Sequence, residues 1–359
     1  MKIRKLVIVC FLMLSLSGYS QAKKDHLPDY GKLLGMALSQ DIKSILKELD
    51  STNMLTEKDK KFKYEFESRF KYEKDKSSYL AKKDTTLNAL NRIYRDYWRK
   101  SMLDKSGKDD KILEKSIFFF LKSENEKYKF TDQKINKKTF EEAYNKYIEF
   151  KGYHTTGYGK TGSLYDFLVW KKNTDTTYRI NLINDTINVS VHFMDGFISL
   201  GWEEYATLGT SYPGGWTTKT ALYCVRQAYD TKSENFMVSY LGHEGQHFSD
   251  YKNYPGLISN DLEYRAKLSE LTFSNENVYK LIAMFINNAK YDKTNAHPFS
   301  NFCIIRDLSK VFFNSDFERD MEKWKSISKS EINNAAKKLF IQNTVNLNAM
   351  GKEVKSILN

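Results

Sequence analysis

The sequence predicts an α+β fold that is predominantly helical, and two observations support this. Over most of residues 23–150, and again after residue 273, apolar residues recur at spacings of three and four, the period of an amphipathic helix. Between these parts, residues 178–226 contain short runs with the alternation or composition of β-strands. We therefore expect a helical N-terminal region at 23–150 and a second region at 151–359 that combines a small β-sheet with a helical C-terminal part.

The helices are expected where the spacing of apolar residues is clearest. Charged residues fill the remaining positions, and few residues in these segments would break a helix. His297 precedes a proline between two of these segments, so we expect a surface loop there; donation of a hydrogen bond to an oxyanion is the alternative role for this histidine. The predicted helices are 38–49, 61–72, 87–102, 111–121, 139–148, 277–290, 302–312, 316–327 and 329–340.

Glycines at 152, 157, 159 and 162 predict a flexible connector ahead of the sheet. Gly159-Lys160-Thr161 matches the end of a phosphate-binding loop, but His154 stands where that loop needs its first glycine, which excludes the interpretation. Asp195-Gly196 predicts a hairpin turn between the second and third strands. The predicted strands are 178–183, 187–193, 197–202 and 217–225.

The residues with the clearest chemical meaning lie in the segment Leu-Gly-His-Glu-Gly-Gln-His-Phe at 241–248. His243 and His247 are four residues apart, so on a helix both imidazoles leave the same face and converge on one ion. Glu244 projects about 100° further round the helix, beside such an ion, where a general base for a bound water is needed. Two ordinary helix histidines are the alternative interpretation.

A catalytic zinc ion needs a third protein ligand and leaves one position for water or substrate. After His247 the chain turns at Pro255-Gly256, and a new helix is predicted from Asn260, its expected N-cap. Glu263 and Glu270 lie two turns apart on nearly the same side of this helix. Both glutamates are therefore candidate third ligands.

Residues 236–273 resemble the HExxH zinc metallopeptidases, and within them the gluzincin branch of the zincins. In that branch the third ligand is a glutamate on a second helix. The resemblance implies that His243, His247 and Glu263 bind Zn²⁺, with Glu270 in reserve as the third ligand, and that Glu244 is the catalytic base.

The resemblance also implies a zincin-like fold, in which a small sheet lies next to the HExxH helix. The edge strand of that sheet pairs with an extended substrate, so residues 216–224 are a candidate edge of the cleft; a plain internal strand is the alternative.

The sequence departs from the gluzincin pattern at one position. Several gluzincins have an aspartate four residues after the glutamate ligand, whereas this chain has Lys267, so a carboxylate that orients a histidine must come from Asp250 or Glu270. Asp250 and Asn253 exclude the metzincin branch, which has glycine and histidine at these places. Gly245 weakens the motif helix by roughly 1 kcal/mol relative to alanine, and we expect another backbone to approach closely there.

Residues 1–22 have the features of a secretory signal peptide. Basic residues within 1–5 precede an apolar run at 6–16, and small residues follow at Ser20 and Ala22. The apolar run is shorter than the ~20 residues that span a membrane. We expect cleavage after Ala22 and export to the periplasm or the medium; an uncleaved anchor is the alternative.

The composition limits the kinds of binding partner that the protein is expected to have. A net charge of +12 over 359 residues is a mild bias without a dense basic patch, which argues against nucleic acid. No later segment is apolar and long enough for an integral membrane span. Cys224 and Cys303 follow the signal peptide, and a disulfide between them is one option in an exported protein.

The expected function is that of an exported zinc metallopeptidase that acts on a peptide or protein substrate. Two alternatives remain: a non-catalytic exported metal-binding or helical interaction protein, and a zinc hydrolase of another bond, such as an amide of cell-wall material. The sequence makes no prediction of the oligomeric state.

Overall fold

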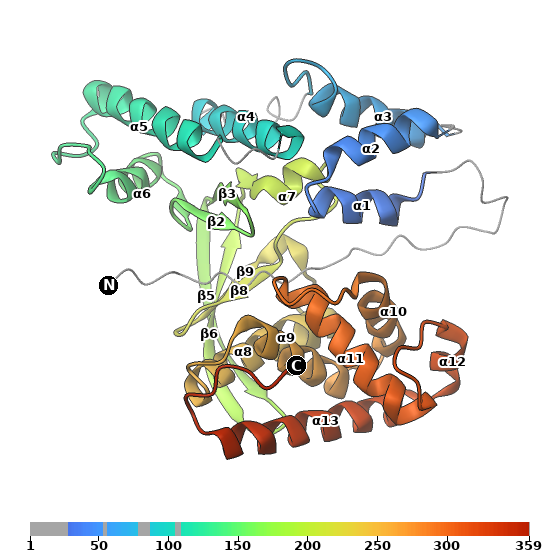
Figure 1. Cartoon of the computed structure of the whole chain (residues 1–359). Coiled ribbons are helices and arrows are strands. Elements are labelled where there is room, and N and C mark those ends of the chain that lie inside the picture. The colour runs from blue at the N-terminus through green and yellow to red at the C-terminus, as the bar shows by residue number, and fades with distance from the viewer. Residues whose placement is uncertain (1–27, 53–55, 78–86, 105–108, 359) are drawn as a thin grey trace. The chain divides into compact units, whose positions relative to one another are not determined.

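The computed structural model describes residues 28–52, 56–77, 87–104 and 109–358 (Figure 1). Most of these residues form helices, and the strands form three small sheets, which confirms the predominantly helical α+β class. The expected signal peptide at 1–22 lies outside the described residues. No helix in the described ranges is both long and apolar enough to cross a membrane.

The described chain forms two compact units that interleave along the sequence. The first, called the N-terminal unit here, comprises the described residues from 28 to 173 and Met194–Pro213. The second, called the C-terminal unit, comprises Thr174–Phe193 and Gly214–Asn359. This division differs from the single boundary expected at residue 150, because the chain enters the C-terminal unit for one strand pair and returns before it completes that unit.

The N-terminal unit consists of amphipathic helices around an apolar core. Tyr94 and Trp98, one helical turn apart, are fully buried and pack in that core, which also includes Phe167 and Tyr205. Its helices are α1 (Tyr30–Leu38), α2 (Ile42–Ser51), α3 (Glu57–Phe70), α4 (Asn88–Asp104), α5 (Asp109–Tyr128), α6 (Phe140–Phe150) and α7 (Gly201–Ala206).

Two small sheets accompany these helices. Strands β1 (His154–Thr155), β4 (Leu168–Trp170) and β7 (Ser199–Leu200) pair in the order β1-β4-β7, and β2 (Gly159–Thr161) pairs with β3 (Leu164–Asp166). The segment predicted as a flexible connector is thus partly a hairpin, whose turn contains Gly162 at a φ of +62°. Gly159-Lys160-Thr161 is itself a strand, which agrees with the exclusion of a phosphate loop.

The predicted hairpin at Asp195-Gly196 is wrong. Strand β7, which follows this turn, pairs with β4 rather than with the strand before the turn. The expected strand 197–202 is also mostly absent, because only Ser199–Leu200 is extended and α7 begins at Gly201. The backbone N–H groups at the start of α7 explain this: Asp166 accepts a hydrogen bond from the N–H of Trp202, and Glu204 accepts one from that of Leu200.

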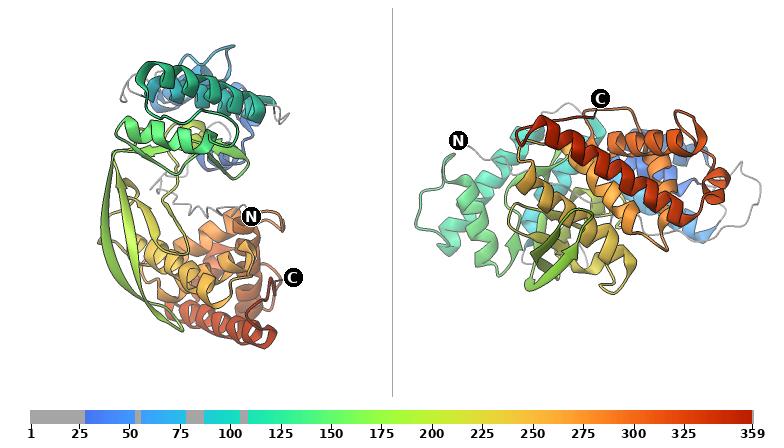
Figure 2. Two further views of the ribbon diagram at one scale, coloured as in Figure 1. Left: turned by 90° about the vertical axis from the view of Figure 1, so that its left-hand side faces the viewer. Right: turned by 90° about the horizontal axis from the view of Figure 1, so that it is seen from below.

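The C-terminal unit has one four-stranded sheet in the order β5-β6-β9-β8. The long strand β5 (Lys172–Asn181) begins, and the long strand β6 (Thr186–Asp195) ends, where the chain passes from one unit to the other. Strand β9 (Leu222–Val225) pairs antiparallel with β8 (Gly215–Thr217). Strand β8 therefore lies at one edge of this sheet. In Figure 2 the two long strands curve along one side of the helices that follow them.

The helices of the C-terminal unit surround one central helix. Helix α9 packs against α8, α11 and α13, and a core that includes Leu268, Phe285, Phe299 and Trp324 holds the group together. The elements are the short 3₁₀-helix η2 (Arg226–Ala228), the π-helix η3 (Asn235–Gly242), α8 (His243–Asn253), α9 (Ser259–Phe273), α10 (Val278–Asn288), α11 (Ala296–Phe313), α12 (Met321–Ser326) and α13 (Lys329–Met350).

Helix α9 is buried on every side. Each residue from Asn260 to Leu271 is at most 9 % exposed, although this segment carries five charged side chains. Charged groups are rarely buried unless they are paired or hold an ion, so each of these charges needs a partner inside the unit. The predicted N-cap at Asn260 is wrong, because α9 begins at Ser259 and the Asn260 amide donates to the carbonyl of Lys293 instead.

Gly245 in α8 faces the sheet. A Cβ atom at this position would lie 3.1 Å from Cδ1 of Ile180 and 3.4 Å from Cδ1 of Ile187. The close approach is therefore made by sheet side chains and not by a second backbone, which corrects the expectation. The two cysteines, Cys224 and Cys303, are buried, and no disulfide joins them.

Candidate metal centre

The motif helix α8 begins at His243, directly after the π-helix η3. The one-turn spacing brings Nε2 of His243 and Nε2 of His247 to 3.2 Å from each other, and both side chains are at most 4 % exposed. A π-helix is rare and often marks a functional site. Both imidazoles face α9, the helix that was expected to supply the third ligand.

Glu263 of α9 completes a group of three donors. Its Oε1 lies 3.3 Å from Nε2 of His247, and its Oε2 lies 3.6 Å from Nε2 of His243. Ligands placed about 2.1 Å from one zinc ion in a tetrahedron are about 3.4 Å from one another. The three spacings, 3.2, 3.3 and 3.6 Å, match that value. His243, His247 and Glu263 also form the one buried group of metal-ligand type among the described residues.

The hydrogen bonding of Glu263 supports the same interpretation. Both carboxylate oxygens are buried, and within the described structure neither accepts a hydrogen bond of good geometry, although nitrogen atoms surround them. Nδ1 of His247 is likewise buried without such a partner in the described ranges. An uncompensated buried carboxylate is costly, and a cation among these donors would remove that cost. The residues present therefore fit a divalent metal ion.

The electrostatic surroundings keep Glu263 ionised, as a metal ligand must be. Burial acts to raise the pKa of this carboxyl, but the positive charges of His297 and Lys267 and the nearby nitrogens of the two motif histidines outweigh it. The pKa of Glu263 consequently lies well below its usual value. The carboxylate is therefore a permanent negative charge across the physiological pH range.

The sequence did not predict that His297 and Lys267 lie beside Glu263; for His297 it offered a role at the oxyanion only as the alternative to a surface loop. His297 lies in the first turn of α11, not in a surface loop as expected, and its Nδ1 is 2.9 Å from Oε2 of Glu263. Lys267 is one turn along α9, and its Nζ is 3.3 Å from the same oxygen. The only signal for Lys267 in the sequence was its departure from the gluzincin pattern.

Glu244 points elsewhere, toward the edge strand. Its side chain is fully buried, and the hydroxyl of Thr217 in β8 donates a short hydrogen bond to Oε2. The same hydroxyl lies 3.2 Å from the backbone carbonyl oxygen of Glu244. Glu244, the expected general base, is thus hydrogen-bonded to the strand that was expected to border a substrate cleft.

The remaining carboxylates of the motif region have separate partners. Oε2 of Glu270 lies 3.5 Å from Nδ1 of His243, on the nitrogen that does not face Glu263. Asp250 instead forms a two-pronged ion pair with Arg265, with distances of 2.9 Å to both Nε and Nη2. Of the two carboxylates considered for orienting a histidine, the structure places Glu270 at the ring and Asp250 away from it.

The start of α9 is anchored by the chain's last described residues. Asp261 accepts hydrogen bonds from the hydroxyl of Ser356 at 2.6 Å and from the backbone N–H of Ile357 at 2.9 Å. The N–H of Ile258, just before α9, donates to the carbonyl of Lys355. These contacts fix the start of α9, two residues before Glu263.

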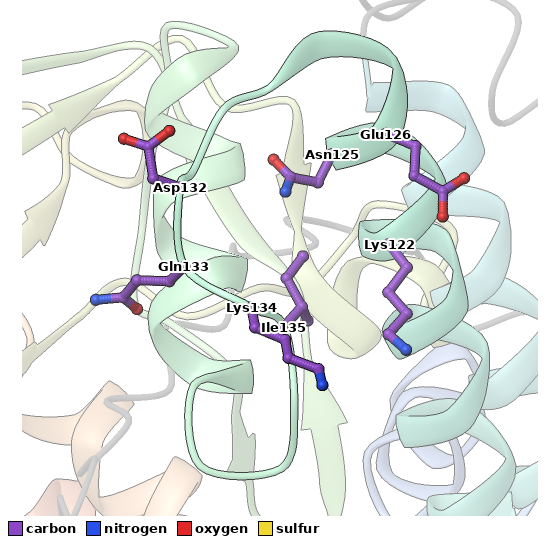
Figure 3. Close-up of a pocket in the computed structure, with 7 residues that line it drawn as sticks. All are labelled: Lys122, Asn125, Glu126, Asp132, Gln133, Lys134 and Ile135. Carbon is purple, nitrogen blue, oxygen red and sulfur yellow. The ribbon is translucent and has the colours of Figure 1, made fainter.

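A separate hollow of about 300 Å³ lies in the N-terminal unit, between the end of α5 and the loop at 132–135 (Figure 3). It contains none of the metal-centre residues. In Figure 3 the side chains of Glu126 and Asp132 point in different directions, so the charged groups do not converge on one point. Among the described residues, the group of metal-ligand type around Glu263 is therefore the candidate site.

Comparisons with known proteins found no relative: no family model, no curated protein and no solved structure matched the chain.

Proposed function

We propose that this protein is a zinc-dependent hydrolase that cleaves peptide bonds. The observation that carries the proposal is the spacing of three buried donors, at 3.2 to 3.6 Å, on two neighbouring helices. His243, His247 and Glu263 would hold Zn²⁺. When bound there, the ion would supply Lewis-acid chemistry, polarising a scissile carbonyl and lowering the pKa of a water molecule.

Side chains of the protein would transfer the proton and orient the groups around the ion. Glu244 follows the first ligand and has a buried carboxylate, so it would accept a proton from the attacking water and deliver it to the leaving amine. Thr217 would hold that carboxylate in one orientation, because its hydroxyl donates to it. Glu270 would orient His243 through Nδ1, in the way that carboxylates commonly support metal-bound histidines.

Strand β8 supports a peptide as the substrate. It lies at the edge of the four-stranded sheet and contacts α8 through Thr217. An extended peptide adds to a sheet edge through backbone hydrogen bonds, which bind the main chain whatever the side chains are. A peptide on β8 would therefore lie beside the strand residue that holds Glu244. We further propose export, on the basis of the signal-peptide features of residues 1–22.

The test compares metal content with hydrolysis in the full chain. Elemental analysis should find one zinc per chain in the wild type and in Glu244→Gln, and none in His243→Ala. A mixture of quenched fluorescent peptides should be cleaved by the wild type and not by Glu244→Gln, with a loss of about 10²–10⁴-fold.

Each remaining result has a distinct meaning. Hydrolysis by zinc-loaded Glu244→Gln would remove the assignment of the base. Stoichiometric zinc without cleavage of any peptide would favour a non-catalytic metal-binding protein, and cleavage confined to cell-wall fragments would favour a hydrolase of another amide. A wild-type protein without zinc would end the proposal.

A further inference from the structure

Lys267 occupies a place in the metal centre that the proposed reaction does not use. It lies on the wholly buried helix α9, and its side chain is 6 % exposed. Its ammonium group donates a 2.7 Å hydrogen bond to the hydroxyl of Ser300 and lies 3.3 Å from the carbonyl oxygen of His297. Both partners belong to α11, so two helices fix the position of this charge.

The fixed charge is directed at one oxygen of the proposed third ligand. Nζ of Lys267 is 3.3 Å from Oε2 of Glu263, and Nδ1 of His297 is 2.9 Å from the same atom. The other oxygen, Oε1, faces His247. Oε2 thus lies near Lys267, His297 and, at 3.6 Å, His243, whereas Oε1 faces His247.

Two effects of Lys267 on a bound cation oppose each other. The ammonium helps to hold the Glu263 carboxylate in place, which aids binding, but a positive charge in a buried site also repels a dication strongly. His297 lies closer to the same oxygen than Lys267 does, so the carboxylate keeps a positioning partner when Lys267 is removed. Lys267 adds a full positive charge beside the one that the His297 ring brings, so its removal should reduce the repulsion more than it loosens the carboxylate.

We propose that Lys267 is a built-in counter-charge that weakens metal binding, so that the ion at this site exchanges with free metal in the surroundings. The inference rests on the proposed function, because it takes His243, His247 and Glu263 as the ligands. It predicts that activity follows the free zinc concentration outside the protein.

The experiment measures the zinc dissociation constant of the full chain by competition with a chromogenic chelator at constant pH. Lys267→Met, of similar length and without charge, should bind zinc at least tenfold more tightly than the wild type. Lys267→Arg keeps the charge and should stay within about threefold of the wild type. Lys252→Met, which removes an exposed lysine of α8, is the matched control and should have no effect.

The outcomes separate the inference from the proposed function. Equal or weaker binding by Lys267→Met, with a wild type that binds one zinc, would overturn the inference and leave the metal site intact. Absence of zinc from both proteins would remove the site itself. If Lys267→Met does not fold, Lys267→Gln can still hydrogen-bond to Ser300 and must show the same tightening.

Discussion

Oε2 of Glu270 lies 3.5 Å from Nδ1 of His243, while Oε2 of Glu263 lies 3.6 Å from Nε2 of the same ring. One imidazole thus stands between two buried carboxylates that come from the same helix, two turns apart. Only Glu263 also reaches His247, at 3.3 Å. This geometry separates the two glutamates that the sequence left as alternatives: Glu263 is placed to share an ion with both histidines, and Glu270 is placed to orient one ring.

This separation predicts different losses of metal from two substitutions. Glu263→Ala should weaken zinc binding by a factor of 100 or more, because a ligand is lost, whereas Glu270→Ala should weaken it by about tenfold, as is typical for the partner of a ligand. The measurement is the zinc dissociation constant of each purified variant. A larger loss in Glu270→Ala than in Glu263→Ala would mean that the roles are reversed.

Substitution of Thr217 should lower the turnover rate without changing the binding of substrate or zinc. Thr217→Val removes the hydroxyl that donates to Glu244 but keeps the shape of the side chain, so we expect kcat to fall about tenfold with KM and zinc content unchanged. Steady-state kinetics with a peptide cleaved by the wild type provide the measurement. Thr217→Ser restores the hydroxyl and should recover most of the loss; equal losses in both variants would show that the residue only supports the fold.

Substitution of Asp250 should lower the stability of the fold without weakening zinc binding. Asp250→Ala leaves the buried guanidinium of Arg265 without its carboxylate, so the free energy of unfolding should fall by about 3–5 kcal/mol. Denaturant unfolding measures this loss, and Glu276→Ala, at an exposed position of the same unit, should change it by less than about 0.5 kcal/mol. The folded fraction of Asp250→Ala should still bind zinc; a loss as large as that of Glu270→Ala would contradict the distinction.

The N-terminal unit should lose stability as the pH rises, because of a buried carboxyl. Burial, with a smaller contribution from Asp166, raises the pKa of Glu203 from 4.5 to about 8. Between these values the folded unit keeps a proton that the unfolded chain releases, so the free energy of unfolding falls with rising pH across this window and levels off above it. Asp166, whose pKa burial raises from 3.8 to about 6, adds to the slope at the acid end.

Glu203→Gln tests this dependence. The neutral side chain needs no proton, so the variant should be more stable than the wild type at pH 8 by roughly 1–3 kcal/mol and should have a flatter profile between pH 5 and 8. Thermal unfolding at a series of pH values provides the comparison. Glu141→Gln removes an exposed carboxylate of α6 and should leave the profile unchanged. A wild-type profile that rises with pH through this window would refute the assignment.

Features that depend on the spacing of nearby residues could be predicted from the sequence alone. Amphipathic periodicity predicted the helical class and most helices, since burial of one face of a helix requires apolar residues every three or four positions. The four-residue step from His243 to His247 predicted that both rings leave one face, and in the structure their Nε2 atoms are 3.2 Å apart. The hairpin predicted at Asp195-Gly196 was wrong, because the strand after this turn pairs with β4, and such pairing depends on segments far away in the chain.

The pairing of the charged side chains in the metal centre could not be predicted without the packing of the helices and strands. Helix α9 is buried all round, so its own periodicity does not distinguish a ligand from an ion-pair partner. The distinction comes from neighbouring elements: α8 brings the histidines to Glu263, α11 brings His297, and β8 brings Thr217 to Glu244. These residues are up to 80 positions apart, from Thr217 to His297. Contacts across such separations depend on how helices and strands pack, which no local pattern encodes.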